Sequence, residues 1–252
     1  MKKFHSPLSF ASGFMPHVQG GFNQFQFITT DALHERLAGK MEVRSNESVA
    51  TVIAGIEEGQ TIQLAPDVWT YSSPLVITKS CSIIGHPLGT KIKRGEGLTS
   101  GPMVSVEADN VVLKNIYFED DTSLTDVDCI GVTDRTNLVV SECVMSGFSR
   151  GINNSGGDNH TYAFNSVSAS TIGIDVQGEA RFNRITANQI VMTPDTVLSV
   201  SMGSSVSATA VTGNVCNSGI SFHNTGSAQT FSSPGGLSNH VAGNVAALTE
   251  TT

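Results

Sequence analysis

The stretch TIQLAPDVWTYSSPLVI, residues 61–77, and the run CSIIG at 81–85 consist of short β-branched segments separated by Pro, Asp and Ser. Segments of this kind favour strands, and the turn residues between them interrupt any helical period. Similar runs follow at 103–106 and beyond. We therefore predict an all-β chain, from about Thr61 to Val245, that is built from many strands of three to five residues.

Apolar residues recur at intervals typical of a β-solenoid. The segments VLKNI (112–116), VVSEC (139–143), AFNSV (163–167) and RFNRI (181–185) share one pattern, and aligning their last residues with Val215 and Val245 gives steps of 27, 24, 18, 30 and 30. A second series, Ile130, Ile152 and Ile174, repeats every 22 residues. Two such series indicate two sheets of one solenoid. We expect about seven coils in a rod roughly 35 Å long.

The segment 61–77, continued by 82–85, resembles the first coils of the pectin-lyase-like superfamily, in which a short helix caps the rod. The resemblance implies a right-handed single-stranded parallel β-helix with a short N-terminal capping helix and an extended N-terminal arm. This superfamily includes polysaccharide lyases, glycoside hydrolases, and the tailspikes and other appendages of bacterial viruses. The resemblance therefore favours a fold without selecting an activity.

A capping helix is also indicated by the residues before the first strand. Val49, Val52, Ile53 and Ile56 follow the spacing of one apolar helix face, and Asn46 or Ser48 can cap its first turn. We predict three segments: an aromatic-rich arm at 1–46, the capping helix at 47–59 and the parallel β-helix at 60–252.

The charge distribution excludes several classes of partner. Only 14% of residues are charged, against about a quarter in an average protein, and the net charge is -8. An acidic chain without a basic cluster is a poor ligand for nucleic acid, and no apolar run is long enough to span a membrane. Residues 4–30 and 196–249 contain no Asp, Glu, Lys or Arg, which predicts that other subunits cover them.

The cysteines and the arm complete the sequence-level predictions for structure. The four cysteines have no C-x-x-C spacing, and each lies beside apolar strand residues, so we expect buried free thiols. Half of the twelve Phe lie in the arm, where we expect them to bind a partner protein. These residues are Phe4, Phe10, Phe14, Phe22, Phe25 and Phe27.

Acidic residues between 119 and 134 are the best candidates for chemistry. Glu119, Asp120, Asp121, Asp126, Asp128 and Asp134 fall within one predicted coil and its loop, and a glycosidase needs two carboxylates on either side of the bond it cuts. A lyase would need acidic ligands for Ca²⁺ and a basic residue, for which Arg135 and Arg150 are available. If the chain is an enzyme, its catalytic residues are Asp120, Asp121, Asp128, Arg135 and Arg150.

Motif comparisons weigh against hydrolysis. The tripeptide Asp128-Cys129-Ile130 resembles part of the Asp-Asp-Cys-Ile motif of pectin-hydrolysing relatives, but Val127 stands in place of the other Asp. Their Gly-His-Gly element is absent from the sequence. His160, after Gly156-Gly157-Asp158-Asn159, could be catalytic, but two Gly and an Asn favour an exposed turn. The acidic residues are then solvated loop residues.

Three functions remain open at this level. The first is a non-enzymatic virion protein, a decoration or cement subunit on the capsid surface of a bacteriophage, homotrimeric and attached through its arm to the major capsid protein or another virion protein. The second is a tailspike-like lyase or glycoside hydrolase, and the third is a glycan-binding rod, which the single Trp supports poorly. The first function requires no cofactor, metal, nucleic acid or membrane.

Overall fold

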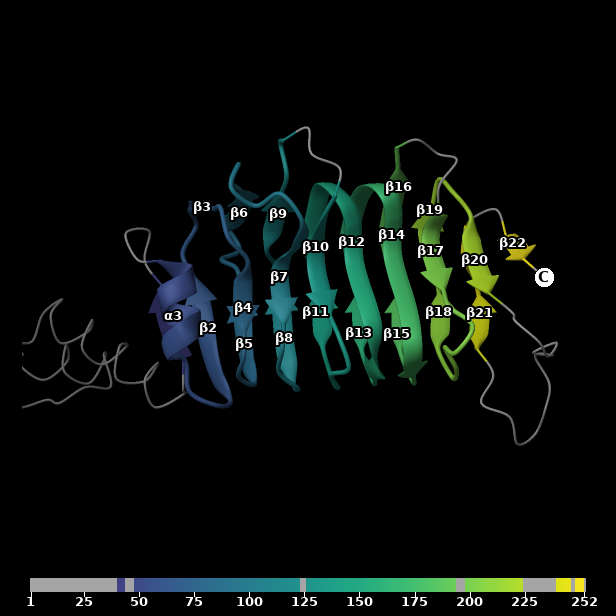
Figure 1. Cartoon of the computed structure of the whole chain (residues 1–252), viewed down its shortest axis with the longest axis horizontal. Coiled ribbons are helices and arrows are strands. Elements are labelled where there is room, and N and C mark those ends of the chain that lie inside the picture. The colour runs from purple at the N-terminus through teal and green to yellow at the C-terminus, as the bar shows by residue number, and fades with distance from the viewer. Residues whose placement is uncertain are drawn as a thin grey trace, which may run out of the picture. The chain divides into compact units, whose positions relative to one another are not determined.

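The computed structural model describes residues 40–43, 48–122, 126–193, 198–223, 239–245 and 248–251. The N-terminal arm, except for its last strand residues, and its six Phe lie outside these residues. The part from Glu42 onward is a right-handed parallel β-helix of about seven turns with one short helix. The predicted fold class is confirmed, and Figure 1 shows the strands stacked from α3 to β22.

Helix α3 (Val49–Gly55) lies at the N-terminal end of the stack (Figure 1). Ser48, one of the two predicted caps, accepts a hydrogen bond from the Thr51 N–H, and Lys79 donates one to the Ile56 carbonyl after the last turn. Val49 and Ile53 are buried against the first coil. The helix therefore covers apolar side chains at the N-terminal end of the core.

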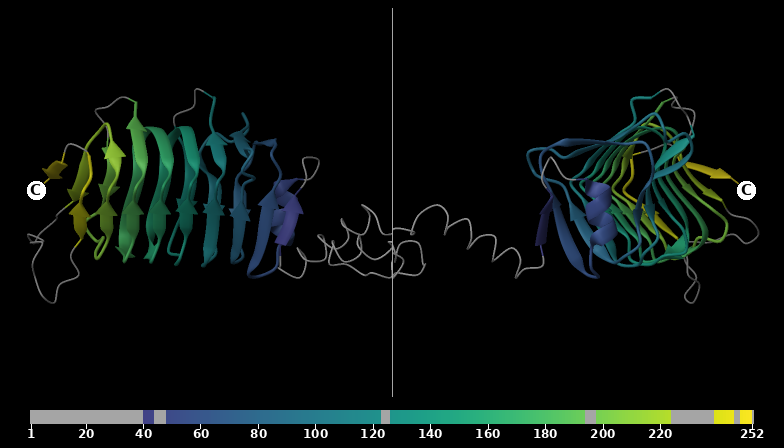
Figure 2. Two further views of the ribbon diagram at one scale, coloured as in Figure 1. Left: turned by 180° about the vertical axis from the view of Figure 1, so that it is seen from behind. Right: turned by 60° about the vertical axis from the view of Figure 1, so that its left-hand side comes forward.

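Two long parallel ladders run along the solenoid (Figures 1 and 2). Sheet A comprises, in spatial order, β1 (Lys40–Val43), β2 (Gln60–Leu64), β5 (Cys81–Ile84), β8 (Val111–Lys114), β11 (Val139–Ser141), β13 (Thr161–Ala163), β15 (Arg184–Thr186), β18 (Ala210–Thr212) and β21 (His240–Ala242). The main run of sheet B comprises β4 (Leu75–Ile77), β7 (Gly101–Val106), β10 (Val127–Val132), β12 (Val144–Asp158), β14 (Ser166–Arg181), β17 (Leu198–Met202), β20 (Ile220–His223) and β22 (Leu248–Thr251).

A third run of paired strands, which we call the side face, lies between the two. It joins the first residues of β12 and β14 to five shorter strands: β3 (Val68–Tyr71), β6 (Lys91–Arg94), β9 (Tyr117–Glu119), β16 (Gln189–Met192) and β19 (Val215–Cys216). Each coil thus contributes one strand to sheet A and one to each of the other two runs through most of the rod. The view in Figure 2 that is turned by 60° shows successive coils nearly superimposed.

The core is made of side chains that stack from coil to coil. In sheet B, Ile130 pairs with Ile152 and Ile152 with Ile174, all fully buried, as the 22-residue series predicts. In sheet A, Leu113, Val140, Tyr162, Ile185 and Val211 form the corresponding buried column. All four cysteines are buried free thiols, as predicted. Burial of these apolar columns is the main stabilising contribution to the fold.

The first series is correct only in part. Val167 pairs with Met145, and Ile185 pairs with Tyr162 and Val211, so the predicted steps of 24, 18 and 30 residues between Cys143 and Val215 are wrong. The last step of 30, from Val215 to Val245, is correct. The residue that corresponds to Cys143 in the next coil is Asn165, and the next three equivalents are Asn188, Asn214 and Asn244. Hydrogen bonds join these positions across separations of 22, 23, 26 and 30 residues.

These asparagines form an internal amide ladder at the corner between sheet A and the side face. The Asn188 side-chain oxygen accepts hydrogen bonds from the backbone N–H and side-chain Nδ2 of Asn165, at 2.9 and 3.0 Å. Its own Nδ2 donates to the Tyr162 carbonyl at 2.9 Å. Asn214 repeats this pattern one coil later. At the corner, backbone N–H and carbonyl groups have no partner within a sheet, and the asparagine side chains form hydrogen bonds with them instead.

Candidate functional site

Asp128, Arg150 and Asp175 lie together on the outer side of sheet B, on three successive strands. Asp128 is on β10, Arg150 on β12 and Asp175 on β14. The pairing of Ile130 with Ile152 places Asp128 and Arg150 in one column, and Asn153 pairs with Asp175 in another. The sheet register therefore brings two of the predicted residues together and adds Asp175, which the sequence analysis did not select.

Both oxygens of each carboxylate in this group accept a hydrogen bond. Asp128 accepts one from Arg150 Nε at 2.9 Å and one from Asn153 Nδ2 at 2.8 Å, through different oxygens. Asp175 accepts one from Arg150 NH1 at 3.3 Å and one from Gln177 at 2.6 Å, again through different oxygens. A carboxylate that serves as general base or nucleophile needs an oxygen that is free to meet substrate. The group is arranged as a clamp across three coils.

Arg150 is held in its charged form by this clamp. Burial disfavours the guanidinium, but the hydrogen bond from Arg150 to Asp128 and the charges of Asp128 and Asp175 raise the pKa of Arg150 above its usual value. A guanidinium in this state is a poor proton acceptor. Arg150 is therefore unsuited to the role of the lyase base and well suited to neutralising two buried carboxylates.

Asp120 is separated from this group and is inaccessible. It forms an ion pair with Arg94 of β6, and neither side chain has exposed surface. Its other oxygen accepts hydrogen bonds from the Thr122 N–H and hydroxyl, and Arg94 Nε donates to the Leu98 carbonyl. Gly147, at a φ of 89°, leaves the space for the Asp120 carbonyl that any Cβ would occupy. The pair is a structural element of the interior.

Asp121 and Glu119 belong to the side face. Lys93 donates a hydrogen bond to Asp121 at 2.7 Å and forms an ion pair with Glu119 at 3.4 Å, and Lys91 lies 3.1 Å from Glu119. The bond from Lys93 lowers the pKa of Asp121. Burial disfavours the Glu119 carboxylate, but hydrogen bonds from Lys91, Tyr117 and Lys93 lower its pKa below the usual value. Both residues are permanently ionised partners of lysines at neutral pH.

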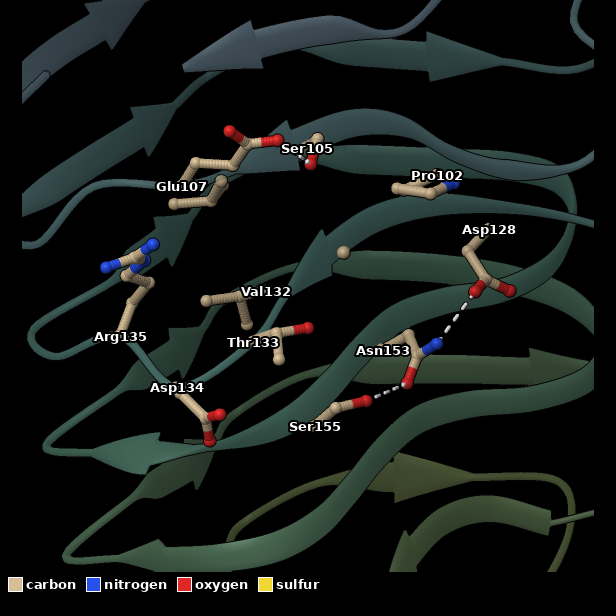
Figure 3. Close-up of a pocket in the computed structure, with 12 residues that line it drawn as sticks. Pro102, Ser105, Glu107, Asp128, Val132, Thr133, Asp134, Arg135, Asn153 and Ser155 are labelled. Carbon is tan, nitrogen blue, oxygen red and sulfur yellow. Dashed lines mark hydrogen bonds between the residues drawn. The ribbon is translucent and has the colours of Figure 1, made fainter. Parts of the chain in front are cut away.

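A polar pocket of about 460 Å³ lies beside Asp128 on sheet B (Figure 3). Asp128 and Asn153 occupy one end of it, whereas Asp134 and Arg135 come from the loop after β10. Gly131 also lines the pocket, and a Cβ at this position would approach the Pro102 side chain to 2.8 Å. Arg135 thus shares the pocket with Asp128, while Asp120 and Asp121 are absent from its lining.

The interpretation of residues 156–160 as an exposed turn is wrong. Strand β12 continues to Asp158, Gly156 is buried, and the ring of His160 lies in the core with its centroid 6.0 Å from that of Tyr162. His160 Nδ1 accepts a hydrogen bond from the Leu138 N–H at 3.0 Å, and burial lowers the pKa of the imidazole. The two glycines are needed instead because the turning strand has positive φ there. A buried, hydrogen-bonded His160 cannot meet a substrate.

The described residues contain no group of three or more His, Cys, Asp or Glu side chains that converge as metal ligands. In the same part of the chain, no helix has the length and hydropathy to cross a bilayer.

The outer surface of the side face changes character along the rod. One column runs through Val68, Lys91, Tyr117, Val144, Ser166, Gln189, Val215 and Val245. Its C-terminal half, together with Val191, contains no charged residue. We call Val144, Ser166, Gln189, Val191, Val215 and Val245 the neutral side face. In the sequence, this surface is indicated only by apolar residues at outward positions, such as exposed Val215 before buried Cys216.

Comparison with known proteins extends to the fold alone. No protein-family model and no curated protein sequence matches the chain. A solved structure of the pectin methylesterase from Aspergillus niger is similar, with a TM-score of 0.55 and 12% identity, over 83% of this chain and 86% of that one. At this identity the likeness supports the parallel β-helix fold and carries no activity with it.

Proposed function

We propose that this chain is a non-enzymatic structural protein of a bacteriophage virion, a decoration or cement subunit on the capsid surface. The observation that carries the proposal is the state of the candidate acids: Asp120, Asp121 and Asp128 each bind a cation from a neighbouring coil. Side chains used in this way link neighbouring coils of the rod. A rod that carries an uncharged region such as the neutral side face is suited to permanent assembly contacts.

In this proposal the arm at residues 1–46 binds the major capsid protein or another virion protein, and the rod forms a homotrimer. The arm's six Phe would be buried against the partner, which offsets the entropy lost when the arm becomes ordered. The compact unit starts at Glu42, and β1 (Lys40–Val43) belongs to sheet A with Val43 buried in the core. A truncation that spares the core therefore ends at residue 39.

The test uses virions that carry this gene and a matched truncation. We expect the full chain to be found in purified virions by mass spectrometry and on the heads by immunogold labelling. A chain lacking residues 1–39, a truncation that keeps β1 and removes all six Phe of the arm, should keep the circular dichroism of the full chain yet be missing from particles. Absence of the full chain from virions, or normal occupancy by the truncated chain, would contradict the proposal.

The pocket beside Asp128 favours one second candidate, an enzyme acting on polysaccharide. It lies on the outer side of a parallel sheet and is lined by carboxylates, amides and hydroxyls, which are groups that bind sugars. The similar solved structure is described as a pectin methylesterase, which makes polysaccharide the first class of substrate to test. The purified chain should be screened against acidic and capsular polysaccharides for lyase, hydrolase and esterase products, with Asp128→Ala as the control. Turnover that Asp128→Ala abolishes would establish this alternative and exclude a purely structural role.

A further inference from the structure

Four valines of the neutral side face are exposed, three of them in regular strands and Val245 in an isolated bridge to Val215. Val144 and Val191 are 39% and 40% exposed, and Val215 and Val245 are 54% and 66% exposed. Val144, Val191 and Val215 alternate with buried Met145, Ile190 and Cys216, so the pleat fixes their outward direction. On the N-terminal side the column continues with Tyr117 and Lys91, and the charge of Lys91 ends the uncharged stretch.

Phe164 extends this patch at the corner of the rod. It precedes Ser166 of the neutral side face, is 65% exposed and has a φ of 58°. Equivalent corner positions are occupied by Asn115, Glu142, Ala187, Gly213 and Gly243. A bulky aromatic residue is unfavourable in left-handed backbone, whereas Gly and Asn are tolerated there. The folded protein therefore bears a conformational cost that presents an apolar ring to the outside.

Charge decides which partner fits this patch. The chain carries a net charge of -8, so two copies repel each other wherever their acidic surfaces meet. A basic partner or a nucleic acid gains nothing from a surface without charged groups. A second copy of the same chain, approaching with its own neutral side face, brings the two molecules together with no ion buried and no charge opposed.

We infer that the neutral side face with Phe164 is the surface through which copies of this chain associate side by side. This inference rests on the homo-oligomer of the proposed function and names the contact. Five coils at about 4.8 Å spacing give a patch roughly 20 Å long. Its few side chains are well below the roughly 20–30 residues that each partner contributes to a standard interface. Association of the isolated protein should consequently be reversible and dependent on concentration.

The experiment is sedimentation velocity of the full chain from about 1 to 500 µM, a range that covers weak association. The wild type should shift from monomer to oligomer within this range. Val215→Lys and Val191→Lys should each weaken association by about tenfold or more, because the contact would bury unpaired ammonium groups. The matched control is Val68→Lys, which alters a 52% exposed valine in the same column beside Lys91 and should associate as the wild type does.

A second variant separates contact from folding. Phe164→Asn relieves the left-handed backbone, so its melting temperature should rise by about 1–4 °C while association weakens. A monomer at all concentrations, unchanged association of both lysine variants, or equal weakening by Val68→Lys would overturn the inference. If the chain is found on virions and remains monomeric, this inference and the proposed homotrimer fail, while the virion role stands. If it self-associates through this face but is absent from virions, the proposed virion role fails and the inference stands.

Discussion

Strands β6 and β9 carry Lys91, Lys93 and Glu119 on the side face, whereas β16 and β19 carry Gln189, Val191 and Val215 on the same surface. The buried polar groups also differ between the N-terminal and the later coils. The N-terminal coils enclose the Arg94–Asp120 ion pair, and the later coils enclose the amide ladder that begins at Asn165.

The contrast shows that two kinds of polar chemistry hold adjacent coils of one solenoid together. At the corner before the side face, Ile116 and Cys143 occupy the positions that asparagines take in later coils. Amides satisfy the backbone internally without any charge, so the C-terminal coils need no ion pairs to fix their register. Their outer surface is then available for apolar contact.

The largest effect is expected from opening the N-terminal pair. Arg94→Met leaves Asp120 buried without its cation, and breaking a buried pair in this way costs about 3–5 kcal/mol. Urea unfolding should show this loss relative to the wild type. The double variant Arg94→Met/Asp120→Leu should recover much of it, because no lone charge remains. Equal instability of the single and double variants would mean that packing, rather than charge, is responsible.

The contribution of the amide ladder in the later coils is tested by Asn188→Ala. The change removes the acceptor for the Asn165 N–H and the donor to the Tyr162 carbonyl, both buried. Leaving these groups unpaired should lower the free energy of unfolding by about 2–3 kcal/mol. Hydrogen exchange should report the loss at Asn165 first. The exposed Gln189→Ala, one residue away, serves as control, and a similar loss there would contradict a specific role for the ladder.

The coiled fold could be predicted from sequence because a parallel solenoid repeats its apolar residues once per coil. The series through Ile130 crosses two coils of equal length and therefore predicted the correct register. The other series failed because the rod has two corners with the same local pattern. Phe164-Asn165 and Phe182-Asn183 both place a left-handed Phe before an inward Asn, but Asn165 bonds to Cys143 and Asn183 to His160, on opposite sides of sheet A.

The candidate site was less predictable for a related reason. Asp120, Asp121 and Asp128 are near in sequence, but they point to the interior, the side face and the outer side of sheet B respectively. Proximity along a coil does not specify which way a side chain points. Asp175 joins Asp128 only through Arg150, two coils along, and that register depends on the lengths of the intervening turns. Coil register decides which acids meet.

The pH dependence of stability tests the coil of His160, which lies between the N-terminal coils with the buried ion pair and the later coils with the amide ladder. Burial lowers the pKa of His160 in the folded state below its ordinary value of 6.5, although the charges of Asp158 and Asp109 oppose this. The unfolded chain therefore binds more protons below about pH 6.5, and stability should fall as the pH decreases from there. His160→Asn, which copies Asn183 of the next coil, should flatten this dependence in urea unfolding between about pH 7 and 5. The same slope in both proteins would place the titrating group elsewhere.

The smallest effect on stability is expected from the exposed ion pair between Asp121 and Lys93. Asp121 lies on the surface, where water and salt screen its bond to Lys93, and Lys93 retains Glu119 as a second partner. Asp121→Ala should leave the melting temperature unchanged within error, at low and at high salt alike. If it were instead as damaging as Arg94→Met, the stability of the N-terminal coils would come from their surface ion pairs. The N-terminal and later coils would then differ in stability because of their surface charges, and the buried Arg94–Asp120 pair would not explain the difference.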